Sequence, residues 1–185
     1  MSTYRTTRFL TRLLLMLAVV SVGMARAVAA PSQGDSEEIN KLLADAKTEA
    51  VELKGDAHEM ESFTRSGVSW QSHAEKITLI KEHLNKCGEV VQKLNDAKST
   101  GSPWQQKAIE RITPLLSELA NNIEATIEHL NNNPNQVHLQ PFKDYVVANH
   151  DLANELAALI NDFVDYGKFK EKFESLGNKL EVAER

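Results

Sequence analysis

The chain has 185 residues, 42% of them hydrophobic, with 21 lysines and arginines against 26 aspartates and glutamates and a formal net charge of −5. This length and apolar fraction fit one domain with its own core. An acidic surface repels polyphosphates and anionic lipids, so the composition argues against nucleic-acid binding. Cys87 is the only cysteine, which excludes an internal disulfide. We expect it to be a buried apolar side chain, the alternatives being a reactive thiol or an intermolecular disulfide.

Residues 1–29 have the pattern of a secretory signal peptide. Arginines precede an apolar run at 13–22, and small residues lead to Ala29. The run is about half as long as a helix that crosses a bilayer, which favours a cleaved signal over a membrane anchor. We expect cleavage after Ala29 and a periplasmic or secreted protein without membrane attachment. Cleavage removes four arginines and no acid, which leaves 17 basic against 26 acidic residues and a formal charge of −9.

Beyond that segment, apolar residues recur in steps of three and four, the spacing of helices packed in a bundle. After a disordered tether at 30–35, this spacing and the capping residues predict helices over about 36–65, 69–98, 103–131 and 141–183. The short links between them predict antiparallel neighbours. The sequence therefore predicts an all-α fold for residues 36–185. We expect an up-down-up-down four-helix bundle with an extended or hinged C-terminal helix.

Each predicted helix has a seam of residues expected in the core. The first seam comprises Ile39, Leu43, Ala46, Ala50, Leu53, Ala57 and Met60. The second comprises Trp70, His73, Ile77, Ile80, Leu84, Cys87, Val91 and Leu94. The third comprises Ile109, Ile112, Leu116, Leu119, Ile123, Ile127 and Leu130, and the fourth Phe142, Tyr145, Asn149, Leu152, Leu156, Leu159, Phe163 and Tyr166. Such seams have to be covered by neighbouring helices.

Local signals mark the start of the third helix and an irregularity within it. Ser102, Pro103 and Gln105 have the spacing of a capping box with proline at the first helical position. Pro114 lies inside the same helix, where it removes a backbone hydrogen bond and is expected to produce a kink. The apolar spacing continues on both sides of Pro114, so we do not expect the helix to end there.

The last predicted helix is the longest. Its apolar spacing continues through Gly167 to residue 183, which favours one continuous helix over a hinge at Gly167 and a separate terminal helix. A continuous helix outruns its three neighbours and exposes Phe169, Phe173 and Leu176. We therefore expect a protein partner of unknown identity at this end, or a homodimer through 163–183.

Five of the six histidines fall near one end of the predicted bundle, where the first and third helices end and the second and fourth begin. Bundles hold haem and metals through inward-facing side chains of facing helices. This predicts cofactor-binding candidates at Met60, His73, Tyr145 and Asn149, and metal-ligand candidates at His58, His129 and His150. The competing interpretation is that the histidines cap helices or face solvent, and that Asn149 is a buried asparagine that sets the helix register.

Several catalytic and cofactor motifs are absent from the sequence. It has no Cys-x-x-Cys-His, Glu-x-x-His, His-Glu-x-x-His or Gly-x-Ser-x-Gly. Its acidic residues alternate with lysines along helix faces, as on a solvated surface. We therefore expect no enzyme and no cofactor, but a periplasmic or secreted bundle with a protein-interaction, structural or stress role. The alternative is a carrier of haem or a divalent transition metal at the histidine-rich end.

Four segments resemble those of a group of exported proteins. Residues 69–74 (SWQSHA), 102–106 (SPWQQ), 124–131 (EATIEHLN) and 162–168 (DFVDYGK) are similar to segments of uncharacterised exported helical-bundle proteins of acidobacteria. The resemblance covers most of the chain after the signal peptide. It implies export and a helical bundle, and it implies no activity and no site residues.

Overall fold

The computed structural model describes residues 34–183, and their side chains through residue 180. This part of the chain is all-α, with four helices: α1 (Glu37–Phe63), α2 (Trp70–Ala97), α3 (Pro103–Asn132) and α4 (Gln140–Ala183). Two one-turn 3-10 helices, η1 (Lys98–Thr100) and η2 (Pro134–Gln136), lie in the links. The described residues include no strand. The predicted signal peptide at 1–29 lies outside the described residues.

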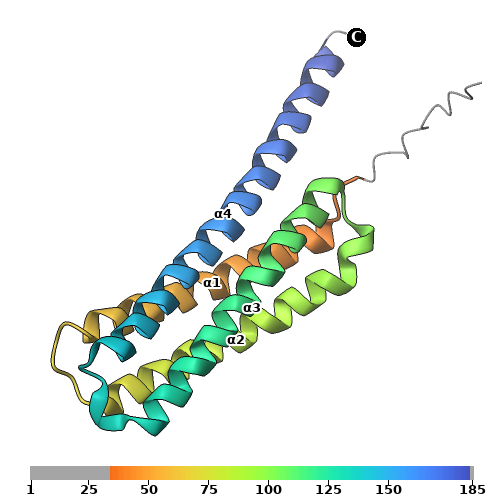
Figure 1. Ribbon diagram of the computed structural model, residues 1–185. Coiled ribbons are helices and arrows are strands. Elements are labelled where there is room, and N and C mark those ends of the chain that lie inside the picture. Colours follow the sequence, from red (N-terminus) through yellow and green to blue (C-terminus); the bar gives the residue numbers. More distant parts are fainter. Residues whose placement is uncertain (1–33, 184–185) are drawn as a thin grey trace, which may run out of the picture. The chain divides into compact units, whose positions relative to one another are not determined.

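The helices form the predicted up-down-up-down bundle (Figure 1). α1 packs mainly against α2 and α4, and α3 packs against the same two helices, so the order in space follows the order in the chain. Each helix begins and ends within two residues of its predicted bounds. α3 runs through Pro114 without ending, and α4 runs through Gly167 as one helix, so the hinge alternative was wrong.

Side chains cap the helix starts as the sequence indicates. The Ser36 hydroxyl accepts a hydrogen bond from the backbone N–H of Ile39 at 3.4 Å at the start of α1. The Ser69 hydroxyl accepts one from Ser72 in the same way at the start of α2. These oxygens satisfy backbone donors that have no partner within the helix, which fixes where each helix begins.

The cores of α1 and α2 follow the predicted seams closely. All seven predicted residues of α1 are buried, as are seven of the eight in α2. Trp70 is the exception, because it is the first residue of α2 and lies beyond the end of α1, where few side chains cover it. Cys87 is fully buried, and burial raises the pKa of its thiol to about 12. It is therefore a core side chain with an inert thiol, as expected.

The seam predicted for α4 is wrong at five of its eight positions. Tyr145, Leu152, Leu159 and Phe163 are only half-buried, and Tyr166 is exposed. The buried residues are Phe142, Val146, Asn149, Ala153, Leu156, Ala157, Ile160 and Val164. α4 contacts both α1 and α3, so its central row is the one that faces between them, and the larger side chains lie on the flank toward α3. Thr126 likewise takes the buried position predicted for Ile127 in α3.

Candidate functional site

The first candidate site is the histidine end, where α1 and α3 end and α2 and α4 begin. Met60, His73 and Asn149 are buried there, and Tyr145 is half-buried. The topology therefore brings the four predicted cofactor-binding candidates to one end of the bundle. What they can do depends on whether their polar atoms remain free to bind a ligand.

His73 and His129 pack as aromatic rings around Phe142. The ring centroids of His73 and Phe142 are 5.0 Å apart and nearly perpendicular, and the His129 ring lies 6.1 Å from Phe142. Phe63 covers His73 from α1, and Tyr145 lies 5.4 Å from His129. His73 Nδ1 and His129 Nε2 are buried without a hydrogen-bond partner among the described residues. Burial lowers the pKa of His73, which favours a neutral imidazole packed as an apolar side chain.

The predicted metal ligands do not form one cluster. His58 and His150 pair across α1 and α4, with ring centroids 5.4 Å apart, whereas His129 packs on Phe142 and Tyr145. Within residues 34–180, no three histidine, cysteine, aspartate or glutamate side chains lie close enough together to hold a metal ion. A protein metal site generally needs at least three such ligands in one place.

Asn149 makes two side-chain hydrogen bonds with α3, one through each of its polar atoms. Its side-chain oxygen accepts from Asn122 Nδ2 at 2.7 Å, and its amide nitrogen donates to Thr126 Oγ1 at 2.8 Å. Asn122 also donates to the backbone oxygen of Tyr145 at 3.2 Å. These bonds form only when α3 and α4 are aligned in this register, so the arrangement supports a register-setting role for Asn149 over ligand binding.

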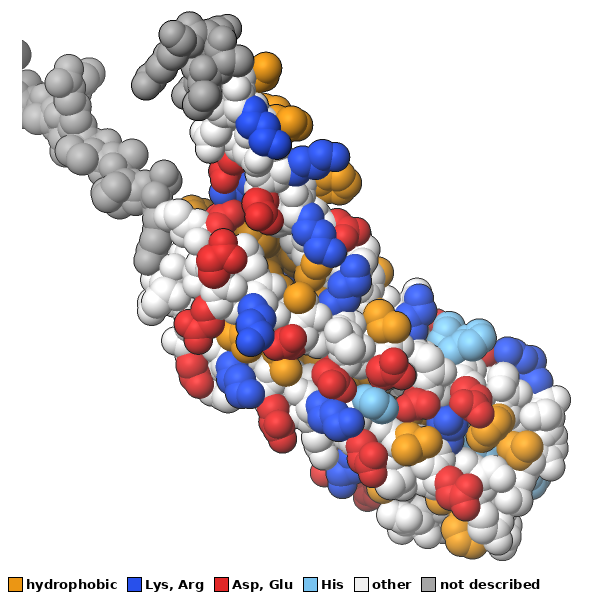
Figure 2. All heavy atoms as spheres, turned by 180° about the vertical axis from the view of Figure 1, so that it is seen from behind, with side chains coloured by type: hydrophobic (Ala, Val, Ile, Leu, Met, Phe, Trp, Pro, Cys, Tyr) orange, Lys and Arg blue, Asp and Glu red, His pale blue; other side chains and the backbone are white. Residues whose placement is uncertain are grey.

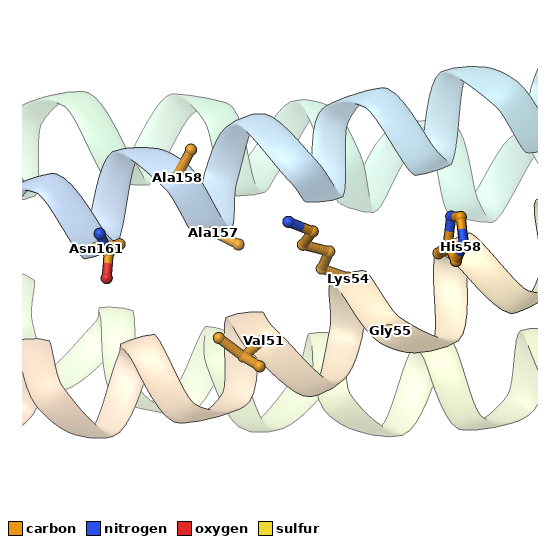
Figure 3. Close-up of a pocket in the computed structure, with 7 residues that line it drawn as sticks. All are labelled: Val51, Lys54, Gly55, His58, Ala157, Ala158 and Asn161. Carbon is orange, nitrogen blue, oxygen red and sulfur yellow. The ribbon is translucent and has the colours of Figure 1, made fainter.

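A shallow groove between α1 and α4 offers few side chains that could bind a ligand or take part in a reaction. It is lined by Val51, Lys54, Gly55, His58, Ala157, Ala158 and Asn161. In Figure 3 Ala157 and Asn161 point from α4 toward α1, Lys54 points from α1 toward α4, and Ala158 points away. The lining is mostly small, apolar and open to solvent, without a buried polar side chain to orient a ligand.

The second candidate site is the part of α4 that extends beyond the other helices (Figure 1). We call residues 167–183 the extension; at 1.5 Å per residue it is about 25 Å long. Its exposed large apolar residues are Phe169, Phe173, Leu176 and Leu180, which we call the apolar stripe. The exposed Tyr166 lies next to the stripe, at the base of the extension. Figure 2 shows hydrophobic side chains along one edge of this helix with lysines beside them. The spacing is that of a coiled-coil seam.

A cluster at the base of the extension holds it to the bundle. Asp35 accepts hydrogen bonds from Trp104 Nε1 and from Lys170 Nζ, both at 2.8 Å. The Trp104 ring packs edge-on against Tyr166, and a Cβ atom on Gly167 would lie only 2.9 Å from that ring. Partial burial raises the pKa of Asp35, but hydrogen bonds from Lys170, Ser102 and Trp104 outweigh it and keep the pKa below its usual value.

The sequence did not predict this cluster, and the cluster corrects the prediction that Asp35 belongs to a disordered tether. The Asp35 carboxylate is bound to α3 and α4. Nearby, the buried Gln105 side chain bonds both backbone groups of Ser36 at 2.9 Å and Asn40 Oδ1 at 2.8 Å. The sequence showed only the capping role of Gln105, because contacts between residues this far apart leave no local pattern.

Comparison of the chain with protein-family models, with curated proteins and with solved structures finds no match. The resemblance to exported acidobacterial bundle proteins therefore stays a prediction. None of the helices within residues 34–183 combines the length and the apolar character needed to cross a membrane.

Proposed function

We propose that the protein is an exported interaction protein without enzymatic activity, and that it binds a helical partner through the apolar stripe of α4. The observation that carries the proposal is the exposure of Phe169 and Phe173, 72% and 79%, on a helix that extends past its own bundle. Exposed apolar side chains gathered at helical spacing mark surfaces that a partner covers. Single apolar side chains on a surface carry no such meaning.

The size of the stripe supports the same conclusion. Leu176 and Leu180 add exposed fractions of 50% and 69%. With about 150–250 Å² for an aromatic side chain, the stripe exposes on the order of 500 Å² of apolar surface. That is in the range of the largest apolar patch on an ordinary monomer, which is often a functional surface.

The cluster at the base makes the extension suited to binding. Lys170 binds the first turn of the extension to Asp35, and Trp104 of α3 donates to the same carboxylate. The Trp104 ring also fits against the bare backbone of Gly167. A helix that is already formed and already oriented loses less conformational freedom when a partner binds. The export part of the proposal rests on the sequence pattern at 1–29.

Cysteine labelling in cells that export the protein tests this function. Leu176→Cys places a thiol on the stripe, and Asn178→Cys places one on the opposite face of the same helix. Cys87 gives little background because it is buried and its thiol pKa is about 12. We expect a maleimide to label position 176 roughly tenfold more slowly than position 178 in these cells.

The matched measurement uses the same two variants, purified and diluted to nanomolar concentration. There, positions 176 and 178 should react at similar rates, because dilution removes any partner. Equal labelling rates at positions 176 and 178 in the exporting cells would show that no partner covers the stripe there. That result would contradict the proposed function.

A further inference from the structure

We infer that the helix covering the apolar stripe is the same extension of a second copy of this chain, lying antiparallel to the first. This inference rests on the proposed function and names its partner. It follows from where α3 begins and from how the stripe pairs with itself, and the charges beside the stripe provide its test.

The start of α3 limits the direction in which a partner helix can run. The apolar stripe continues the half-buried flank of α4, where Phe163 lies beneath Arg111 of α3 and Tyr166 packs on Trp104. α3 begins at Pro103, so it occupies this flank below the stripe and leaves the flank free above it. A partner helix on the stripe therefore meets the first turn of α3 if it continues toward the bundle.

Only one orientation of a second copy avoids this obstacle. In a parallel pair, the second copy's α4 continues alongside the bundle of the first, and the two α3 helices compete for the same space. In an antiparallel pair, the second copy's bundle lies beyond the far end of the extension. Each extension then fills the flank that the other leaves free, which gives the self-complementary contact of a two-fold dimer.

The antiparallel pairing also matches side chains by size. Aligning the two extensions about the midpoint of the stripe places Phe173 against Leu176 of the second copy and Phe169 against Leu180 of the second copy. Each layer then combines one aromatic and one leucine side chain, which fills a layer evenly. Counting both copies, the covered apolar area is on the order of 1,000 Å², the lower limit for a specific interface. We therefore expect a dimer dissociation constant near the micromolar range.

Charges beside the stripe give this arrangement a distinctive signature. Lys172 and Lys179 are exposed and flank the stripe on the same side. Antiparallel pairing brings Lys172 of one copy beside Lys179 of the other, twice per dimer, because residues on equivalent flanks meet in antiparallel coiled coils. A parallel pair places Lys172 beside Gly177 of the second copy instead. Only the antiparallel dimer therefore contains two repulsive pairs at this place.

Sedimentation equilibrium of the exported, purified protein tests the inference with two substitutions. Phe173→Glu introduces a charge into the centre of the stripe and should leave a monomer at every concentration measured. Lys172→Glu converts both repulsive pairs into attractive ones and should lower the dissociation constant of the dimer roughly tenfold. The matched control is Lys168→Glu, which makes the same charge change on an exposed residue away from the stripe and should have little effect.

Each outcome decides between the alternatives. A wild-type protein that stays monomeric to several hundred micromolar would overturn the second-copy inference, and slow labelling of position 176 in cells would still support the proposed function with another partner. A dimer insensitive to Lys172→Glu would contradict the antiparallel arrangement. A dimer that persists in Phe173→Glu would place the interface elsewhere. Circular dichroism of the variants checks that the helices remain formed.

Discussion

The two halves of α4 carry the same heptad spacing and have opposite surroundings. Over 140–166 the helix packs against α1 and α3 and buries Phe142, Leu156 and Ile160 completely. Over the extension, the same spacing leaves Phe169 and Phe173 mostly exposed. The same apolar spacing is therefore buried in one part of α4 and exposed in the other.

The comparison teaches that periodicity specifies a helix and an apolar face but not what covers that face. The bundled half buries a row rotated by about one residue from the predicted seam, because two neighbouring helices choose the row between them. The extension keeps its apolar row on the α3 side, where residues 34–183 supply no further helix. We interpret residues 140–166 as the part of α4 that stabilises the bundle and the extension as the part that binds a partner.

The largest expected effect contrasts one buried and one exposed residue of α4. Leu156→Ala should lower the free energy of unfolding by about 2–5 kcal/mol, because it opens a cavity in a fully buried layer. Phe173→Ala should change it by less than about 0.5 kcal/mol in dilute protein, since 79% of that residue is exposed among the described residues. Urea unfolding followed by circular dichroism measures both. Equal losses of unfolding free energy at the two positions would contradict the contrast between the buried and the exposed part of α4.

A smaller loss is expected from the hydrogen-bonded contact between α3 and α4. Asn149→Ala leaves the half-buried Asn122 amide without its acceptor and the buried Thr126 hydroxyl without its donor. We expect a loss of about 1–3 kcal/mol in the free energy of unfolding. Asn178→Ala on the extension serves as the control and should be near neutral, because Asn178 is exposed and has no hydrogen bond within the described residues.

The fit of Trp104 against the base of the extension gives a contrast between two helical glycines. Gly55→Ala should stabilise the fold by about 1 kcal/mol, because alanine is the better helix former and a Cβ there meets no atom within 4 Å. Gly167→Ala should lack this gain, because its Cβ would lie 2.9 Å from the Trp104 ring. Thermal unfolding of both variants measures the difference, and a similar gain at Gly167 would show that the fit is loose.

The smallest effect concerns pH and the histidine end. Burial lowers the pKa of His73 below the usual 6.5. Below about pH 6.5 the unfolded chain takes up a proton that the folded chain does not, so this contribution to stability is present at pH 7 and is lost as the pH falls toward the folded pKa. His73→Phe should flatten the fall in unfolding free energy between about pH 7 and pH 5. His138→Gln, at an exposed loop position, controls for removing a histidine.

The sequence predicted most of the fold. Helix ends could be read from Ser36, Ser69 and Pro103, since capping acts within a few residues. The seams of α1 and α2 could be read because their apolar rows are narrow. The row of α4 could not be read, because Leu152 and Ala153, like Leu159 and Ile160, offer two adjacent apolar rows, and only the neighbouring helices select one.

The candidate sites were predicted less completely. The sequence placed His73, Met60 and Asn149 together at one end, but it could not show that Phe142 packs between two imidazoles or that Asn149 already has its partners. The link from Asp35 to Trp104 and Lys170 joins residues distant in the chain, and no local pattern announces such contacts. The exposed stripe was predicted from the length of the last helix and from the apolar spacing that continues through Gly167.

Amide hydrogen exchange along α4, measured at two protein concentrations, tests the central claim most directly. In protein diluted well below micromolar, we expect residues 142–164 to be strongly protected and residues 169–180 to exchange orders of magnitude faster. At several hundred micromolar, protection of 169–180 should rise while that of 142–164 stays unchanged. An extension that exchanges equally fast at both concentrations would contradict a surface that a second copy covers.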